Sequence, residues 1–453
     1  MPTRQWSTLF SRRQSREAIQ LNHSEHPAAA TKIPMVLCNA GYYGTLAAIR
    51  SLGRSGVPVV TVDPSILAPA RYSRYSNLHL NSPPFEMTND WVDWLLRLGS
   101  SGPRRAIYAT SDAVSFALAL HRDKLISVFD LYQPGIDAII SILDKGRLHQ
   151  HARAVGIATP RTCLPESAKD AQRMIRDVGG TILIKPRSQL AVRDYPKGIV
   201  VDTGTIDGQA EYEFFSRQSA HEHEFARRFP ETMLPMIQRF HPEAMRSVYS
   251  LSGFRDVSGA HTVMLGAHKV LQHPCQIGIG LCFEEADVAP KLADQTLRLC
   301  ERIGYYGAFE LEFIFSDGEP LLIDFNGRFY NQLAFDIARG MDLPQLVYAA
   351  AIGELNEVTR LTSAFQTQRE KGGLAFCNSF GLSFTLTAHN ALKTLSRGEA
   401  EHWKAWRRGY EGRLVDAVRD DADPFPAFVD MTRQLLQSVR HPRAFAREMG
   451  LVK

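Results

Sequence analysis

One segment of this sequence alternates apolar and polar residues on both sides of a short turn, and it constrains the fold more than any other. The segment reads GAFELEFIFSDGEPLLIDFNGRFYNQ and covers residues 307–332. Ser316-Asp317-Gly318 separates its two apolar stretches, and such a turn between alternating segments is typical of a β-hairpin. Residues that lie opposite one another in a hairpin point to the same side of the sheet. The sequence therefore predicts a hairpin with polar side chains along one face.

Four polar residues follow one another along this predicted hairpin. Glu312 closes the first apolar stretch and Asp324 ends the second, so we expect both on one face. Asn326 lies two residues after Asp324, hence on the same face, and Arg328 follows two residues later. Two carboxylates and an amide oxygen are hard ligands that hold Mg²⁺ against a phosphate, and a guanidinium meets phosphate oxygens with a planar fork of donors. The alternative is a solvated hairpin whose acidic residues have no function.

The composition is that of an ordinary globular chain. Its 453 residues are 44% apolar and 22% charged, which is enough for roughly two to four structural units. The net charge of +4 is too small to indicate nucleic-acid binding, and no apolar run of about eighteen residues indicates a membrane span. Six cysteines without CxxC spacing favour a reduced, cytoplasmic setting. Residues 1–33 are basic and lack a signal-peptide core, so we expect a disordered tail there.

The segment 34–143 has the alternation of strands and helices that indicates a parallel sheet. A buried strand at 35–38 precedes a glycine-containing turn, a helix over about 45–54 and a second strand that ends at Asp63. Asn39-x-Gly41-x-x-Gly44 nearly matches the dinucleotide-binding fingerprint, with Asn in place of the first glycine. Two interpretations stay open: the dinucleotide site of an NAD-dependent oxidoreductase, and a turn that only needs small residues.

Glu312, its spacing to Asp324 and the string IDFNGR resemble the metal-binding strands of ATP-grasp enzymes. The usual pattern there is a Glu followed by E-x-N-x-R, and this sequence has Asp in place of the second Glu. The resemblance implies an α/β chain, in which a Rossmann-like N-terminal domain precedes a two-subdomain α+β ATP-grasp fold and a small C-terminal extension. It also implies ATP with Mg²⁺ or Mn²⁺ held by Glu312, Asp324 and Asn326, and it places Arg328 at the transferred phosphate.

Three lysines within the segment 144–355 fit the same resemblance. Asp144-Lys145 opens a helix that ends at about Ala154, and this lysine would reach a phosphate of ATP. Lys185 ends the short apolar strand TILIK, so its stem packs while its ammonium meets the α- and β-phosphates. Lys269, near the end of a later strand, would face the phosphate-transfer centre.

Two further segments bear on nucleotide binding. The string MIQRFHPE resembles the segment that runs along the adenine, where the Gln238 side chain would meet the amino group and backbone groups of Arg239 and His241 would meet the base edge. The loop after Lys185 departs from the family pattern because it has few glycines. We therefore expect side chains to cover the phosphates, namely those of Arg187, Ser188 and Lys197.

The resemblance fades in the segment 356–453. Residues 372–387 are apolar and predict a strand, and residues 425–439 have the pattern of an amphipathic helix. The string HWKAWRRGYEGR combines basic and aromatic side chains. It has two interpretations, a surface for nucleic acid or anionic lipid and a packed helix with a solvated rim, and the second is favoured.

These expectations lead to an ATP-dependent carboxylate–amine ligase. The stretch from Gly41 to Ser73 also resembles the start of ligases of the D-aspartate ligase type. Such an enzyme forms an acyl phosphate and then an amide, with release of ADP and phosphate, from a carboxylate and an amine that are amino acids or peptide-like. We expect no nucleic-acid or membrane partner, and a homodimer stays open. The alternatives are an ATP-grasp carboxylase or kinase, and a nucleotide-binding regulatory module without turnover.

Overall fold

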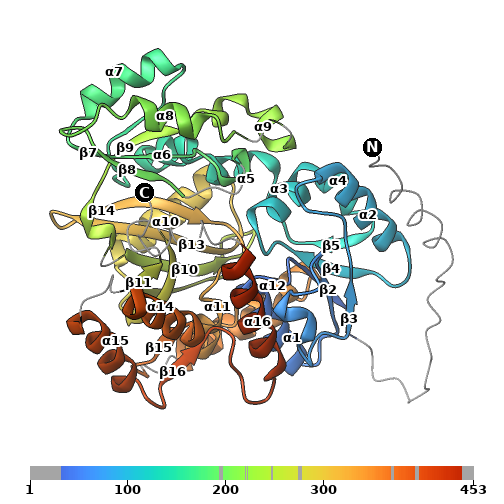
Figure 1. Ribbon diagram of the computed structural model, residues 1–453. Helices are drawn as coiled ribbons and strands as arrows, with labels where there is room; N and C mark the ends of the chain where they lie inside the picture. The colour runs from blue at the N-terminus through green and yellow to red at the C-terminus, as the bar shows by residue number, and fades with distance from the viewer. Residues whose placement is uncertain are drawn as a thin grey trace, which may run out of the picture. The chain divides into compact units, whose positions relative to one another are not determined.

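The computed structural model describes residues 32–192, 197–219, 221, 223–245, 248–273, 278–368, 372–392 and 397–440. Every helix and strand reported below belongs to the unit Ile33–Lys453 (Figure 1). The tail expected at 1–33 lies outside the described residues except for its last two positions. None of the described helices combines the length and the apolar character that a membrane span requires.

A five-stranded parallel sheet forms the N-terminal part, in the order β3-β2-β1-β4-β5. Met35 and Leu37 of β1 pack on one side of this sheet, and the alternate residues Val36 and Cys38 pack on the other. Both faces are therefore buried, as parallel sheets require, and the Rossmann-like expectation is confirmed. The elements are β1 (Met35–Cys38), α1 (Tyr43–Arg54), β2 (Val59–Val62), β3 (Leu78–Leu80), α2 (Thr88–Ser100), β4 (Arg105–Tyr108), α3 (Asp112–Leu120), α4 (Arg122–Leu125), β5 (Phe129–Leu131) and α5 (Ile136–Leu143).

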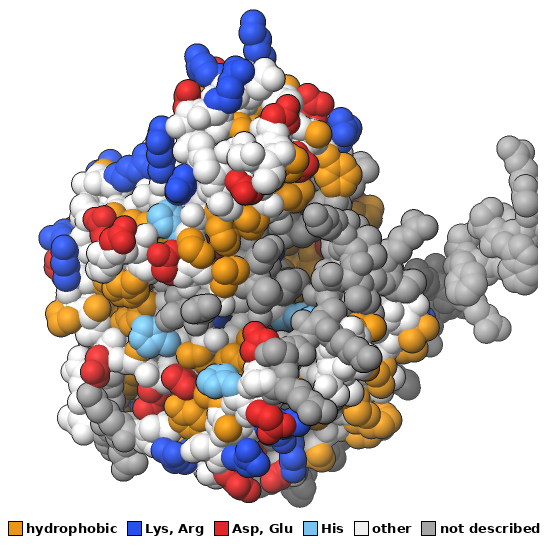
Figure 2. Space-filling model, turned by 60° about the vertical axis from the view of Figure 1, so that its left-hand side comes forward, with side chains coloured by type: hydrophobic (Ala, Val, Ile, Leu, Met, Phe, Trp, Pro, Cys, Tyr) orange, Lys and Arg blue, Asp and Glu red, His pale blue; other side chains and the backbone are white. Residues whose placement is uncertain are grey.

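A four-stranded sheet in the order β6-β9-β7-β8 follows, with α7 and α8 on one face. Ile182 and Ile184 of β7 pack against these helices, so Leu183 and Lys185 point to the opposite face. Figure 2 shows exposed Lys and Arg side chains at the top of the view, where α7 lies. The elements are α6 (Lys145–Ala154), β6 (Thr162–Cys163), α7 (Ala168–Val178), β7 (Thr181–Lys185), β8 (Ile199–Asp202), α8 (Gln209–Ser216), α9 (Glu224–Arg228) and β9 (Met236–Arg239).

The third sheet has seven strands in the order β14-β13-β10-β11-β12-β15-β16. On β13, Phe309, Leu311 and Phe313 pack against a core that α5, α6 and α10 share, so Glu310 and Glu312 point to the other face. The elements are β10 (Val248–Arg255), β11 (Thr262–His273), β12 (Ile279–Ala286), α10 (Pro290–Ile303), β13 (Gly307–Ser316), β14 (Glu319–Asn326), α11 (Leu333–Ala338), α12 (Leu343–Ala351) and α13 (Leu355–Gln368).

The last part of the chain extends this sheet. β15 (Ala375–Cys377) pairs with β12, and β16 (Leu414–Asp416) pairs with β15. The strand predicted over 372–387 is wrong beyond Cys377, because Asn378 caps a helix there: its side-chain oxygen accepts from the Gly381 N–H at 2.8 Å. The helices of this part are α14 (Ser379–Leu392), α15 (Arg397–Gly409) and α16 (Phe425–Arg440).

The basic and aromatic stretch at 402–413 is part of a packed helix with a solvated rim up to Gly409, and a turn follows. Trp403 and Trp406 of α15 pack against the apolar cluster around Cys282 and Cys377. The Trp406 indole N–H donates to Glu284 Oε1 at 2.6 Å. The favoured interpretation of this stretch is therefore the one that the structure shows.

Candidate active site

The predicted hairpin forms from β13 and β14. Asp317 and Gly318 both have positive φ angles, 51° and 79°, as the tight turns that suit hairpins require. Glu312 lies directly opposite Asp324, and Glu310 lies opposite Asn326. The two carboxylates and the amide thus share one face, as the sequence predicted. Their role as metal ligands stays a prediction.

Each of the two carboxylates is bound to a lysine from another element. Lys145, the first residue of α6, places Nζ 2.5 Å from Asp324 Oδ1. Lys269 of β11 places Nζ 2.8 Å from Glu312 Oε1. The start of α6 is itself fixed, because the Asp144 side chain accepts from the Gly146 N–H at 2.9 Å.

Two further lysines complete the cluster, which we call the lysine cluster and which consists of Lys145, Lys185, Lys197 and Lys269. Burial, and then the neighbouring Lys145 ammonium, lower the pKa of Lys185 to about 7. Lys197 is exposed as a residue, but desolvation of its ammonium lowers its pKa, although Glu312 opposes the shift. Burial would raise the pKa of Asp324, but Lys145, followed by Lys185 and Lys197, lowers it well below its usual range. Two lysines thus bind the carboxylates directly and two more act on them electrostatically, which suits a polyanionic ligand.

Arg328 follows Asn326 in the sequence and joins the hairpin to the start of α3. Its Nε donates to Asp112 Oδ1 at 2.6 Å, and its Nη2 donates to Asn326 Oδ1 at 2.9 Å. The planar guanidinium is thereby held in one orientation.

The sequence analysis did not identify Glu310, which lies on the polar face of the hairpin and forms hydrogen bonds with its neighbours there. Its side chain is buried and accepts from Asn326, Ser250 and Gln332, at 2.6, 2.6 and 2.9 Å. Burial, and then the nearby Glu312, raise the pKa of Glu310 to about 7. The signal was present in the string FELEF, since Glu310 lies two residues before Glu312 and hence on the same face.

The donor set suits a hard divalent cation. Mg²⁺ takes oxygen ligands and usually keeps several waters or substrate oxygens, so a few protein donors suffice. Glu312, Asp324 and Asn326 carry such oxygens on neighbouring positions of the two paired strands. Within the described part of the chain, no three His, Cys, Asp or Glu side chains form a metal cluster.

The predicted adenine segment lies partly on the face that carries Lys185. Gln238 is buried on that face, since Leu183 pairs with Gln238 and Lys185 pairs with Met236. Its Nε2 donates to Thr162 Oγ1 at 2.9 Å. The alternation of β9 turns the Arg239 side chain to the opposite face.

Several groups of the predicted adenine segment already form hydrogen bonds within the protein. The Arg239 N–H donates to the Arg161 carbonyl at 2.9 Å, and its side chain donates to the Gly179 carbonyl at 2.7 Å. The His241 ring lies 3.1 Å from Ser316 Oγ, at the tip of the hairpin. The roles of Gln238, Arg239 and His241 toward a base therefore stay predictions.

The predicted phosphate cover is only partly in place. Arg187 is held by Asp144, at 2.5 Å between Nη2 and Oδ2, and Ser188 Oγ accepts from the Leu190 N–H at 3.3 Å. Of the three side chains expected there, Lys197 is the one that lies in the lysine cluster. Residues 193–196 of this loop lie outside the described residues.

The near-match to the dinucleotide fingerprint has a packing explanation. A Cβ at Gly44 would overlap the Tyr330 carbonyl, so the start of α1 needs glycine in order to approach that backbone. Asn39 adopts φ 58°, and Asp63 accepts from the Gly41 N–H at 3.2 Å. These contacts favour the interpretation as a turn that needs small residues.

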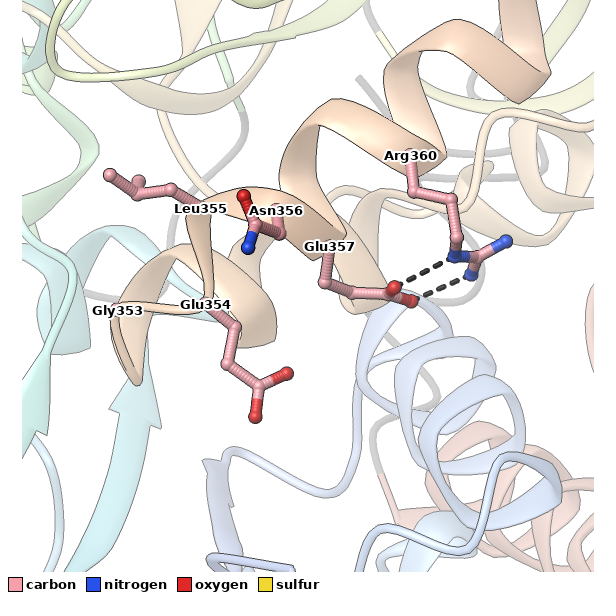
Figure 3. Close-up of a pocket in the computed structure, with 6 residues that line it drawn as sticks. All are labelled: Gly353, Glu354, Leu355, Asn356, Glu357 and Arg360. Carbon is pink, nitrogen blue, oxygen red and sulfur yellow. Dashed lines mark hydrogen bonds and ion pairs between the residues drawn. The ribbon is translucent and has the colours of Figure 1, made fainter.

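A surface pocket lies elsewhere, at the start of α13 (Figure 3). In it Arg360 donates to both oxygens of Glu357, at 2.7 and 2.6 Å. The pocket is lined by Gly353, Glu354, Leu355, Asn356, Glu357 and Arg360, and none of these belongs to the site above.

No protein-family model matches the sequence, and no curated protein matches it. Solved structures do match the fold. An N5-carboxyaminoimidazole synthetase from Staphylococcus aureus, complexed with ADP, is 15% identical over 70% of this chain and 78% of its own, with a TM-score of 0.53. The biotin carboxylase domain of 2-oxoglutarate carboxylase from Hydrogenobacter thermophilus is 16% identical over 71% and 70%, with a TM-score of 0.56. Biotin carboxylase from Campylobacter jejuni is 14% identical over 72% of each chain, with a TM-score of 0.54. At such identities the likeness concerns the fold alone, and the chain has the fold of ATP-grasp enzymes.

Proposed function

We propose that the protein is an ATP-dependent carboxylate–amine ligase that works through an acyl phosphate. The observation that carries the proposal is the direct pairing of Glu312 and Asp324 inside the lysine cluster. Paired carboxylates flanked by lysines suit a divalent cation together with a triphosphate. The ATP-grasp fold supports the same assignment.

The chain's residues would act mainly by charge and by position. Glu312, Asp324 and Asn326 would hold Mg²⁺, which neutralises phosphate charge when bound. Lys145 would exchange its ion pair with Asp324 for phosphate oxygens, and Lys185 would bind phosphate oxygens beside it. Gln238 and the backbone groups of Arg239 and His241 would hold the base, as expected from the sequence.

The reaction consists of two transfers. A carboxylate oxygen of the acid attacks the γ-phosphorus, and ADP leaves with the electron pair of the broken P–O bond. The amine nitrogen then attacks the acyl carbon, phosphate leaves with the electron pair of the C–O bond, and the amine's extra proton passes to solvent. Arg328 and Lys269 would stabilise the negative charge of the acyl phosphate.

We further propose that the substrates are amino acids or peptides. This choice of substrate class rests on the resemblance of residues 41–73 to ligases of the D-aspartate ligase type. A second candidate is an ATP-dependent carboxylation, which shares the first transfer, because biotin carboxylases are among the structures similar in fold.

A product screen tests the proposal. The full chain is incubated with Mg²⁺, ATP and a mixture of amino acids and dipeptides, and the products are identified by mass. We expect ADP, phosphate and a new amide in equal amounts. Formation of AMP would exclude the acyl-phosphate route, and ADP formation that depends on bicarbonate would favour the carboxylase. Nucleotide binding without turnover on any substrate would favour a regulatory module.

A further inference from the structure

The N-terminal sheet has a point at which its strand order reverses, between β1 and β4. In open parallel sheets, ligands bind in the crevice outside the carboxyl ends of the two strands at such a point. Here the loops that follow these two strands are 39–42 and 109–111. Helices α1 and α3 begin directly after these loops, and helix N-termini favour negatively charged groups. Two carboxylates of the chain already lie at these helix starts, since Asp63 accepts from the Gly41 N–H at 3.2 Å and Asp112 is the first residue of α3. An anionic part of a ligand would therefore depend on cationic side chains nearby.

The candidate active site reaches the same crevice. Arg328 Nε donates to Asp112, the first residue of α3, at 2.6 Å. The Phe329 N–H donates to the Ala109 carbonyl at 3.3 Å. A substrate in the crevice would consequently lie beside the arginine that we assign to the acyl phosphate.

The C-terminal helix α16 brings a second arginine to the crevice and lies beside α1 (Figure 1). Arg433 Nη1 donates to the Gly41 carbonyl at 3.2 Å, and its Nη2 donates to Asp430 Oδ1 at 2.6 Å. Its buried Nε has no hydrogen-bond partner among the described residues. A guanidinium carries five N–H donors, so the second N–H of Nη1 and of Nη2 stays available to a ligand, on a side chain that is 22% exposed.

Charges of both signs lie near the exposed side chain of Tyr42. The Tyr42 side chain, at the start of α1, is 42% exposed. Two guanidinium groups and two carboxylates act on its hydroxyl electrostatically, those of Arg328, Arg433, Asp112 and Glu86. A ligand that carries both an ammonium and a carboxylate would find charged groups of both signs near this residue.

We propose that Arg433 binds the carboxylate of an amine substrate that is itself an amino acid, so that α16 selects the amine. This inference rests on the ligase function proposed above. The carboxylate of the amine substrate accepts from Arg433, while its amino group lies toward Asp112 and the acyl carbon held near Arg328. The bond changes are those of the second transfer given above.

The test varies the amine with the acid that the product screen identifies. Three amines are used: L-alanine, L-alaninamide and hydroxylamine, which traps acyl phosphates as hydroxamates and has no carboxylate. The proteins are the wild type, Arg433→Gln, and the control Arg440→Gln, which removes the same charge from an exposed position of α16. Thermal unfolding of each protein checks that its fold is retained.

Arg433→Gln is expected to raise the KM for L-alanine about tenfold to a hundredfold, the size of a lost charged hydrogen bond. It should leave the KM for ATP and the hydroxamate rate unchanged, and it should remove the wild type's preference for L-alanine over L-alaninamide. Arg440→Gln should behave as the wild type.

Two results would overturn the inference while the proposed function stands: an Arg433→Gln enzyme that keeps its preference for L-alanine, or one that loses L-alanine and hydroxylamine turnover equally. A wild type that forms neither ADP nor hydroxamate with any acid would refute the proposed function, and the inference with it.

Discussion

If Lys185 binds nucleotide as proposed, the affinity for nucleotide should depend on pH. Its pKa in the ligand-free protein is about 7, because burial and Lys145 disfavour its charged form. A phosphate oxygen favours the ammonium, so binding should raise this pKa toward the ordinary value of 10.5. At a pH between these two pKa values, Lys185 must take up a proton when the protein binds nucleotide. Affinity should then fall about tenfold, or about 1.4 kcal/mol, for each pH unit above 7.

The direction of this pH dependence follows from the protonation state of Lys185 in the ligand-free protein. Below the pKa of about 7, Lys185 is already charged and the dependence should vanish. Binding should take up about half a proton at a pH equal to this pKa and about nine tenths of a proton one pH unit higher. The effect is confined to nucleotide binding and requires no knowledge of the acid or the amine.

Calorimetric titration with ADP and Mg²⁺ from about pH 6 to about pH 9, in two buffers of different ionisation enthalpy, measures both the Kd and the proton uptake. Lys185→Arg should bind with little pH dependence, because arginine stays charged throughout. Lys185→Met should bind weakly at every pH, and Lys169→Met, on the exposed side of α7, should match the wild type. A wild-type Kd that is constant over this range would refute the reasoning, as would a Lys185→Arg variant with the wild-type slope.

Three further predictions concern single residues. Asp324→Asn should abolish Mg²⁺-dependent ADP formation while thermal unfolding stays close to that of the wild type, and a normal rate would remove this residue from the metal site. Asp423→Ala should lower the free energy of unfolding by about 3 kcal/mol, because the buried carboxylate of Asp423 binds Arg50 at 2.9 Å. Denaturant unfolding measures the change, and Asp421→Ala is the matched control, since the Asp421 side chain is 92% exposed. Equal free energies of unfolding for the two variants would contradict the prediction. Gly44→Ala should lower the melting temperature, since its Cβ would overlap the Tyr330 carbonyl, and an unchanged value in calorimetry would show that the backbone adjusts freely.

Much of the local structure was predictable from the sequence. The helix expected at 145–154 forms with those bounds, because Asp144 caps its start and Gly156, with φ 78°, ends it. The hairpin was predictable because its alternation and its Asp-Gly turn specify the register, and register decides which side chains share a face.

Other local features were ambiguous in the sequence. Residues 372–387 are apolar enough for a strand, yet after Cys377 they form α14. A short apolar run does not distinguish a buried strand from a buried helix. Here the Asn378 cap and the packing of Leu382 decided for the helix.

The sequence by itself determined the polar face of the hairpin, since neighbouring positions and a turn of two residues are enough to align Glu312, Asp324 and Asn326. Only the tertiary structure decided which distant groups meet that face. Lys145 reaches Asp324, and Arg328 reaches Asp112, across long stretches of chain. These contacts depend on how three sheets and their helices pack, because side-chain spacing along one element carries no information about the element that will lie against it. The same holds for α16, whose amphipathic pattern predicted a helix and whose contact with the loop at Gly41 appears only in the folded protein.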